Sequence, residues 1–199
     1  HHVVRRVEPG LLGRERRGGH VHSALIVGGG PAGTALLTAA TKQDRLIELA
    51  RGGLAVVERD VVLGRGAIGN YAITSDSSAE TFLTAVKDNV HADVAALEGH
   101  MSGQEIALHK GGTMGVPLAR TTPFLEATGA RLAQIVAGNG GVVATRSEVI
   151  EARRTRDGLW VARVRNLVTG DERVMRSANL VIATGGYQAR EHVAAEQVA

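Results

Sequence analysis

Short apolar runs bounded by turn residues divide the chain into predicted strands, and two of these runs frame its most informative stretch. Residues 24–27 form a branched apolar run, which is typical of a strand buried on both faces. Residues 34–40 have a helical pattern, and residues 54–57 form a second buried-strand run that ends in an acid. Between them, residues 42–51 either extend that helix or form a short second helix starting at Asp44.

Helical periodicity returns after the second strand. Residues 79–97 carry apolar side chains at helical spacing, which predicts one amphipathic helix. Thr122 and Pro123 predict the N-cap and first turn of another helix, and the glycine-rich residues 138–141 predict its end. Residues 141–145 then form a third short predicted strand.

The pattern next changes from helical to partly alternating. Three strand-like runs are separated by two glycine-containing turns, which predicts a three-stranded antiparallel meander. The runs are residues 149–154, 159–165 and 173–176. Residues 178–183 form a last buried strand. Together these elements predict an α/β fold, a Rossmann-like domain whose parallel sheet is accompanied by the three-stranded antiparallel β-meander.

The stretch from Gly28 to Gly33 reads GGGPAG and satisfies G-x-G-x-x-G directly between the first strand and the first helix. Gly28 permits the tight turn, Gly30 lets a pyrophosphate approach the backbone, and Gly33 lets the helix pack closely on the strand. Pro31 and Ala32 complete the loop and belong to the same predicted binding set. The helix N-terminus that follows offers unpaired N–H groups to phosphates.

Glu58 ends the second strand, where an acid accepts hydrogen bonds from a ribose in dinucleotide sites. It lies 25 residues after Gly33, against about 20 in the usual motif. A glutamate favours an unphosphorylated ribose, hence FAD or NAD over NADP. Arg59 and Arg65, in the following glycine-rich loop, are candidate phosphate or ribose partners or solvated loop residues. The alternative is a helix-capping glycine turn of another α/β protein, with Glu58 a solvated strand end.

Composition excludes several classes of chemistry. The 199 residues contain no cysteine, which excludes disulfides, cysteine metal sites and thiol redox chemistry. No apolar run reaches the roughly 18 residues of a membrane span, and no signal peptide is visible, so we expect a cytoplasmic protein without a membrane partner. His100 and His109 lack carboxylates at ligand spacing, so no metal site is expected. His109 is the one candidate acid or base.

Residues 1–22 are rich in arginine and histidine and are expected to be a flexible basic leader. No aromatic side chains are interleaved with these charges, which argues against binding to single-stranded nucleic acid. We therefore expect no nucleic-acid partner.

In this order the motifs resemble the FAD-binding domain of flavoproteins built from two dinucleotide-binding domains, such as flavin monooxygenases and the pyridine nucleotide–disulfide oxidoreductase-like group. The motifs that carry the resemblance are GGGPAG at 28–33, VVERD at 56–60, the meander, and LVIATGG at 180–186. The resemblance implies that the loop glycines hold the FAD pyrophosphate and that Glu58 holds the adenosine ribose. It also implies that Thr184, Gly185 and Gly186 pass close to the cofactor.

The resemblance implies an FAD-dependent oxidoreductase of the flavin monooxygenase type, with NADPH or NADH as electron donor and a small-molecule substrate. The absence of cysteine excludes the disulfide reductases. No second glycine fingerprint follows, so we expect residues 23–187 to be the FAD-binding, N-terminal part of a longer, truncated or split flavoprotein. Residues 188–199 are expected to form a tail or short helix. The alternatives are a non-catalytic FAD- or dinucleotide-binding module acting with a partner subunit, and an NAD-dependent dehydrogenase, which the meander and ATGG disfavour.

Overall fold

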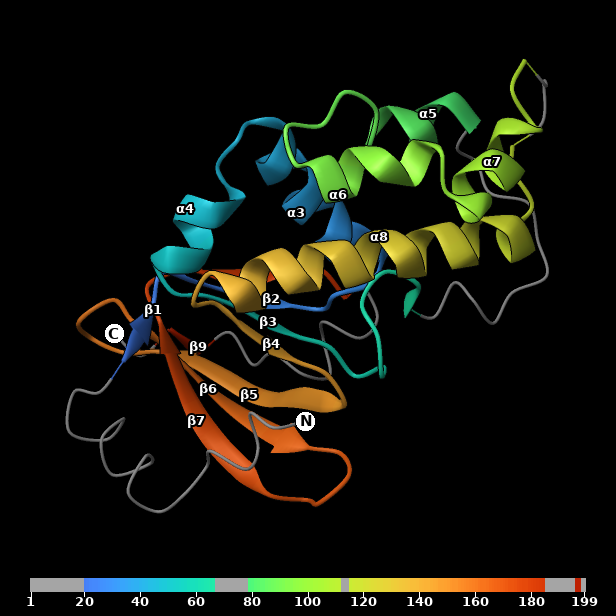
Figure 1. Cartoon of the computed structure of the whole chain (residues 1–199). Helices are drawn as coiled ribbons and strands as arrows, with labels where there is room; N and C mark the ends of the chain where they lie inside the picture. The colour runs from blue at the N-terminus through green and yellow to red at the C-terminus, as the bar shows by residue number, and fades with distance from the viewer. Residues whose placement is uncertain (1–19, 67–78, 112–114, 185–195, 198–199) are drawn as a thin grey trace.

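A computed structural model describes residues 20–66, 79–111, 115–184 and 196–197 (Figure 1). The predicted leader lies mostly outside these ranges, as do Gly185 and Gly186. Most of the predicted C-terminal tail lies outside them too. Only β9 (Glu196–Gln197) is described there, and it pairs with the end of β5.

Four short parallel strands form the central sheet in the order β4-β3-β2-β8. They are β2 (Ala24–Val27), β3 (Leu54–Val57), β4 (Val142–Ala144) and β8 (Leu180–Ile182). All of β3 is buried, as its unbroken apolar run predicts. The chain passes from β2 outward to β3 and β4, and then returns to the other side of β2 for β8. The strand order therefore reverses at β2.

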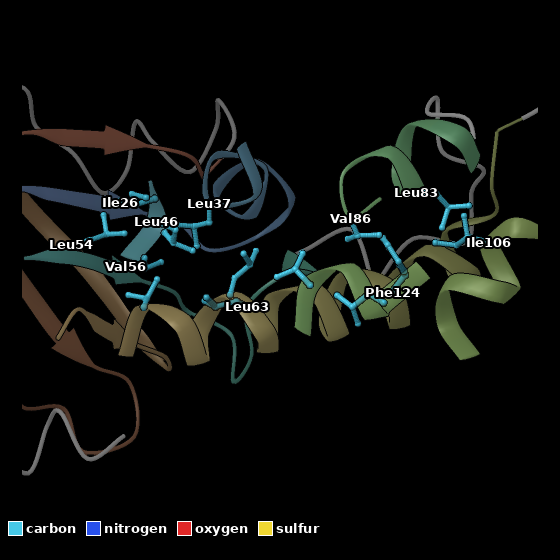
Figure 2. Close-up of a cluster of buried hydrophobic side chains, with 14 of the residues drawn as sticks. Ile26, Leu37, Leu46, Leu54, Val56, Leu63, Leu83, Val86, Ile106 and Phe124 are labelled. Carbon is cyan, nitrogen blue, oxygen red and sulfur yellow. The ribbon is translucent and has the colours of Figure 1, made fainter. Parts of the chain in front are cut away.

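Helices cover one face of this sheet (Figure 1). They are α3 (Pro31–Lys42), α4 (Leu46–Arg51), α5 (Ala79–Thr84), α6 (Ala92–Ala95), the 3-10 helix η2 (Ala96–Glu98), α7 (Met101–Ala107) and α8 (Leu118–Gly138). Figure 2 shows the buried side chains of this layer, from Ile26 and Val56 of the sheet to Phe124 and Ile106 of α8 and α7. One continuous apolar core therefore joins the sheet to every longer helix.

The predicted meander covers the opposite face. It consists of β5 (Ser147–Arg154), β6 (Trp160–Asn166) and β7 (Glu172–Ser177), paired antiparallel. The short β1 (Val21–His22) pairs parallel with β7. Side chains that alternate along β2 and β3, such as Leu25 and Val57, pack against Ala162 and Met175 of the meander. The predicted α/β fold with a parallel sheet and a meander is confirmed.

The structure decides between the two alternatives for residues 42–51 in favour of a short second helix, and two other helix predictions need correction. The chain breaks at Asp44, which has φ +55, and a second helix starts at Leu46. The helix predicted over residues 79–97 stops at Thr84 and resumes only in α6, because Asp88 adopts φ +52. The helix expected to have Thr122 as its N-cap begins five residues earlier, with Pro117 as its N-cap, and Pro123 lies inside it.

The early start of α8 has a local cause. The carbonyl of Pro117 accepts hydrogen bonds from the N–H groups of Arg120 and Thr121, so Pro117 and not Thr122 is the N-cap residue. Pro123 removes one backbone donor from the second turn. Helix α7 was not predicted. The ring of His100 caps it by accepting from the Ser102 N–H at 3.2 Å.

Candidate functional site

The glycine loop turns sharply from β2 into α3 and brings backbone atoms into direct contact. Gly28 has φ +103, and its N–H donates to the Val57 carbonyl at 2.8 Å. A Cβ on Gly28 would lie 2.8 Å from the Ala183 oxygen, and one on Gly33 would lie 2.1 Å from the Gly28 oxygen. Both positions therefore exclude any side chain. The roles predicted for these two glycines in turn formation and close helix packing agree with this geometry.

The N-terminus of α3 has the features of an anion site. Gly30 is the N-cap in an extended conformation, and Pro31 occupies the first turn. Among the described residues, no side chain caps this helix, and no acid lies in its first turn. The amides at the start of a 12-residue helix therefore combine with the positive end of its dipole. A pyrophosphate suits this position, because no capping side chain and no acid of the first turn occupies the helix terminus.

Glu58 connects the glycine loop to the turn after β3. Its side chain is only 8% exposed. Oε1 accepts from the Gly29 N–H at 2.9 Å, and Oε2 accepts from the Asp60 N–H at 2.7 Å. The alternative of a solvated strand end is therefore wrong. Each carboxylate oxygen keeps a second lone pair, so the group can still accept from a hydroxyl.

Residues 59–66 form a wall against the glycine loop. The Gly64 N–H donates to the Gly29 carbonyl at 2.7 Å, and a Cβ on Gly30 would lie 3.2 Å from the Gly66 Cα. On the other side, a Cβ on Gly64 would lie 1.9 Å from the Leu125 oxygen of α8. Residues 59–66 therefore pack between the glycine loop and α8. Leu63, labelled in Figure 2, is buried in the same core.

Arg65 stabilises this wall through ion pairs. Its Nε and Nη2 donate to the two carboxylate oxygens of Asp60 at 2.7 and 3.1 Å, and its Nη1 donates to Glu126 of α8 at 2.9 Å. Hydrogen bonding to Arg65 lowers the pKa of Asp60. Arg65 is thus a bridge between the wall and α8. Sequence reasoning missed Glu126, because it lies 61 residues away along the chain.

The structure brings one further predicted residue, Thr184, to the glycine loop. The carboxyl end of β8 lies beside Gly28, since Ala183 N–H donates to the Val27 carbonyl at 2.8 Å. A Cβ on Gly28 would lie 3.0 Å from Cγ2 of Thr184. Arg59 is exposed directly after Glu58.

His109 belongs to a different part of the molecule. It lies in the turn after α7, where its N–H donates to the Ile106 carbonyl at 3.0 Å. Helix α7 packs against α5 and α8, and it lies at the opposite end of the helical layer from α4 (Figure 1). The hydrogen bonds of the described residues do not connect His109 to the glycine loop or to Glu58.

Within residues 20–66, 79–111 and 115–184, no three histidine or acidic side chains are grouped as a metal site would require. No helix of that part of the chain combines the length and apolarity needed to cross a membrane.

Comparison with known proteins supports the fold. No protein-family model and no curated protein sequence matches the chain. Solved structures do match. A reduced ornithine hydroxylase from Pseudomonas aeruginosa is 16% identical over 84% of this chain and 40% of that chain, with a TM-score of 0.58. The ornithine N-hydroxylase of Kutzneria sp. 744, solved with reduced FAD, NADP+ and L-ornithine, is 19% identical over 82% of this chain and 37% of that chain, with a TM-score of 0.54.

A third similar structure is an aromatic hydroxylase from angucycline biosynthesis, with 17% identity over 86% of this chain and 33% of that chain and a TM-score of 0.50. This chain therefore spans between 33% and 40% of the length of these three proteins. At such identities the similarity concerns the fold. The chain has the α/β fold of Rossmann-type FAD/NAD(P)-binding flavoproteins.

Proposed function

We propose that this chain is the FAD-binding part of a flavin-dependent oxidoreductase of the monooxygenase type, with NADPH or NADH as electron donor. One observation carries the proposal: the uncapped N-terminus of α3 lies beside the buried carboxylate of Glu58, with glycines at every point of backbone contact. A dinucleotide needs this pairing of an anion site and a hydroxyl acceptor. The fold shared with three hydroxylases supports the flavin reading.

In this proposal different residues bind different parts of the cofactor. Gly28, Gly30 and Gly33, together with Pro31 and Ala32, form the cradle of the pyrophosphate. Glu58 accepts from the adenosine ribose, and Arg59 lies next to it. Thr184, followed by Gly185 and Gly186, approaches the flavin half. Bound FAD would supply the redox chemistry.

The strand order gives the two halves of the cofactor separate places. In open α/β sheets, ligands bind beyond the carboxyl ends of the strands where the strand order reverses. Here that point is β2, with β3 and β4 on one side and β8 on the other. Glu58 follows β3, so the adenosine half belongs over β3 and β4. The flavin half then belongs over β8, where Thr184 lies.

The chain's own contribution is binding and orientation. Glu58 and the Arg65 network hold the glycine loop and its wall in place through the chain's own contacts. We assign no catalytic acid or base, and no role to His109. The electron donor and the small-molecule substrate are assigned to another domain or to a partner subunit, because the sequence has no second glycine fingerprint.

An absorption spectrum of the purified chain, supplied with FAD and freed of excess, tests the proposal. We expect flavin bands in the visible range that stay with the protein, and no retained flavin in Gly30→Val. Addition of NADPH or NADH under anaerobic conditions then distinguishes an oxidoreductase from a non-catalytic binding module. Bleaching supports a complete reductive half-reaction, whereas unbleached bands favour a binding module that needs a partner. Absence of retained flavin in the unaltered chain would contradict the proposal.

A further inference from the structure

Arg146 has an unusual backbone conformation beside the proposed cofactor site. In the part of the chain that the structure describes, three non-glycine residues have positive φ: Asp44, Asp88 and Arg146. Short polar side chains such as aspartate tolerate this region by local hydrogen bonding, whereas arginine has no such compensation. Arg146 has φ +45. Its conformation must therefore be maintained by its surroundings.

Backbone hydrogen bonds on both sides hold Arg146 in place. Its N–H donates to the Asp60 carbonyl at 2.9 Å, and its carbonyl accepts from the Leu167 N–H at 2.8 Å. The next residue, Ser147, donates from its N–H to the Glu58 carbonyl at 2.9 Å. Arg146 is thus fixed at the carboxyl edge of the parallel sheet, directly beside the turn that carries Glu58.

The side chain of Arg146 is exposed and has no acidic partner among the described residues. Arg65, which belongs to the same edge, is instead paired with Asp60 and Glu126. Arg146 and Arg65 therefore differ in whether their guanidinium groups are already held in ion pairs. The guanidinium of Arg146 can turn to a ligand without breaking an ion pair.

We propose that Arg146 contacts the adenine base of the bound dinucleotide. The inference rests on the proposed function, because it uses the placement of the adenosine half over β3 and β4. From Glu58 at the ribose, the base must extend along this edge, where Arg146 follows β4 by two residues. A guanidinium is planar and stacks on aromatic faces. Arg146 thereby adds affinity for the adenosine half that the glycine loop alone does not provide.

Calorimetric titration of the full chain with ADP, FAD and inorganic pyrophosphate tests this contact. Glycine adopts positive φ without strain, so Arg146→Gly removes the side chain and keeps the backbone. We expect it to weaken ADP and FAD binding by the same factor, about 5- to 10-fold, and to leave pyrophosphate binding unchanged. Arg146→Lys keeps the charge and loses the planar face, so it should recover less than half of that factor on a logarithmic scale.

Arg156→Gly is the matched control, since Arg156 is an exposed arginine in the β5–β6 hairpin. It should change none of the three affinities. Unchanged ADP binding in Arg146→Gly, or an equal weakening of pyrophosphate binding, would overturn the adenine contact while leaving the proposed function intact. Failure of the unaltered chain to bind ADP and FAD would overturn both. Full FAD affinity in Gly30→Val would overturn the proposed function and, with it, the adenine contact.

Discussion

The proposed cofactor crevice, formed by the glycine loop (residues 28–33) and residues 59–66, and the meander border the same parallel sheet but are built by opposite means. In the crevice, backbone segments pack directly against each other. An added Cβ on Gly33 would lie 2.1 Å from the Gly28 oxygen, and one on Gly64 would lie 1.9 Å from the Leu125 oxygen. On the meander, exposed side chains meet across strands, as in the Arg165–Glu172 pair at 3.1 Å. Around Gly170, in the β6–β7 turn, no described atom lies within 4 Å of an added Cβ.

This difference indicates where the chain tolerates change. Surface ion pairs contribute little, because solvent screens them and their side chains lose entropy on pairing. Backbone contacts leave no room for a side chain, so they require glycine. We therefore expect the same type of substitution to have a large effect on stability or FAD affinity in the crevice and a small effect on the meander.

Gly30→Val should have the largest effect on binding. A branched side chain would occupy the place of the pyrophosphate and press on Gly66, whose Cα lies 3.2 Å from the added Cβ. We expect FAD affinity to fall by at least about 100-fold, or roughly 3 kcal/mol, in a fluorescence titration. Gly138→Val, in open space at the end of α8, is the control. Full FAD affinity in Gly30→Val would show that the loop is not the phosphate site.

Gly64→Ala and Gly170→Ala separate steric contact from backbone strain. Both residues have positive φ, at +109 and +77, so both variants incur the strain of about 1 kcal/mol. Only Gly64 also faces a carbonyl oxygen, that of Leu125. We expect urea denaturation to show an additional loss of roughly 3 kcal/mol for Gly64→Ala. Equal losses of unfolding free energy in the two variants would mean that residues 59–66 shift to accommodate the added methyl group at little cost.

Glu58→Ala and Glu172→Ala compare a buried carboxylate with an exposed one. Removing Glu58 leaves the N–H groups of Gly29 and Asp60 without their acceptor, which costs about 2–3 kcal/mol of unfolding free energy. Removing Glu172 breaks surface pairs with Arg163 and Arg165 and costs about 0–1 kcal/mol. FAD affinity should fall only in Glu58→Ala, by about 1–3 kcal/mol if a ribose hydrogen bond is lost. Similar losses of stability in both variants would contradict the comparison.

His22 makes the contact between the meander and the amino end of the parallel sheet sensitive to pH. It lies in β1, between the meander and β2, and its Nδ1 is 3.0 Å from the Gly53 oxygen. Burial, together with nearby His20, lowers the pKa of His22 to about 4 from 6.5. Between those values the unfolded chain binds a proton that the folded chain does not. Stability should therefore fall as the pH drops below 6.5 and level off below 4.

The size of this effect is about 1–2 kcal/mol between pH 7 and pH 5. Chemical denaturation at a series of pH values measures it. His22→Phe, which cannot bind a proton, should lose this part of the pH dependence. If both proteins showed the same dependence, the folded chain would accommodate a charged His22.

Sequence patterns predicted the parts of the molecule that depend on local order. β2, the glycine loop and β3 follow from apolar runs and from glycines at fixed spacing. The meander follows from Gly158 and Gly170, which have φ +85 and +77 in its two turns. The end of α8 also follows from a local signal, since Gly140 has φ +91 just beyond it.

The remaining features depend either on a competing local signal or on contacts between distant residues. The start of α8 at Leu118 depends on Pro117, whereas Thr122 and Pro123 provided a false local signal. The pairing of Arg65 with Glu126 joins segments that no periodicity relates. Gly64 is required by Leu125 of a distant helix, so its need for glycine is invisible in its own loop.

The most direct test of the account compares the affinity of the purified chain for FAD and for FMN. FMN carries the same flavin and one phosphate but lacks the AMP part of FAD. It therefore lacks the adenosine that Glu58 and the end of β4 are proposed to hold, and it offers the glycine loop one phosphate in place of two. Quenching of flavin fluorescence on titration gives both dissociation constants. We predict that FAD binds at least about 100-fold more tightly than FMN. Equal affinity for the two flavins, or no binding of either, would contradict the assignment of this crevice to a dinucleotide.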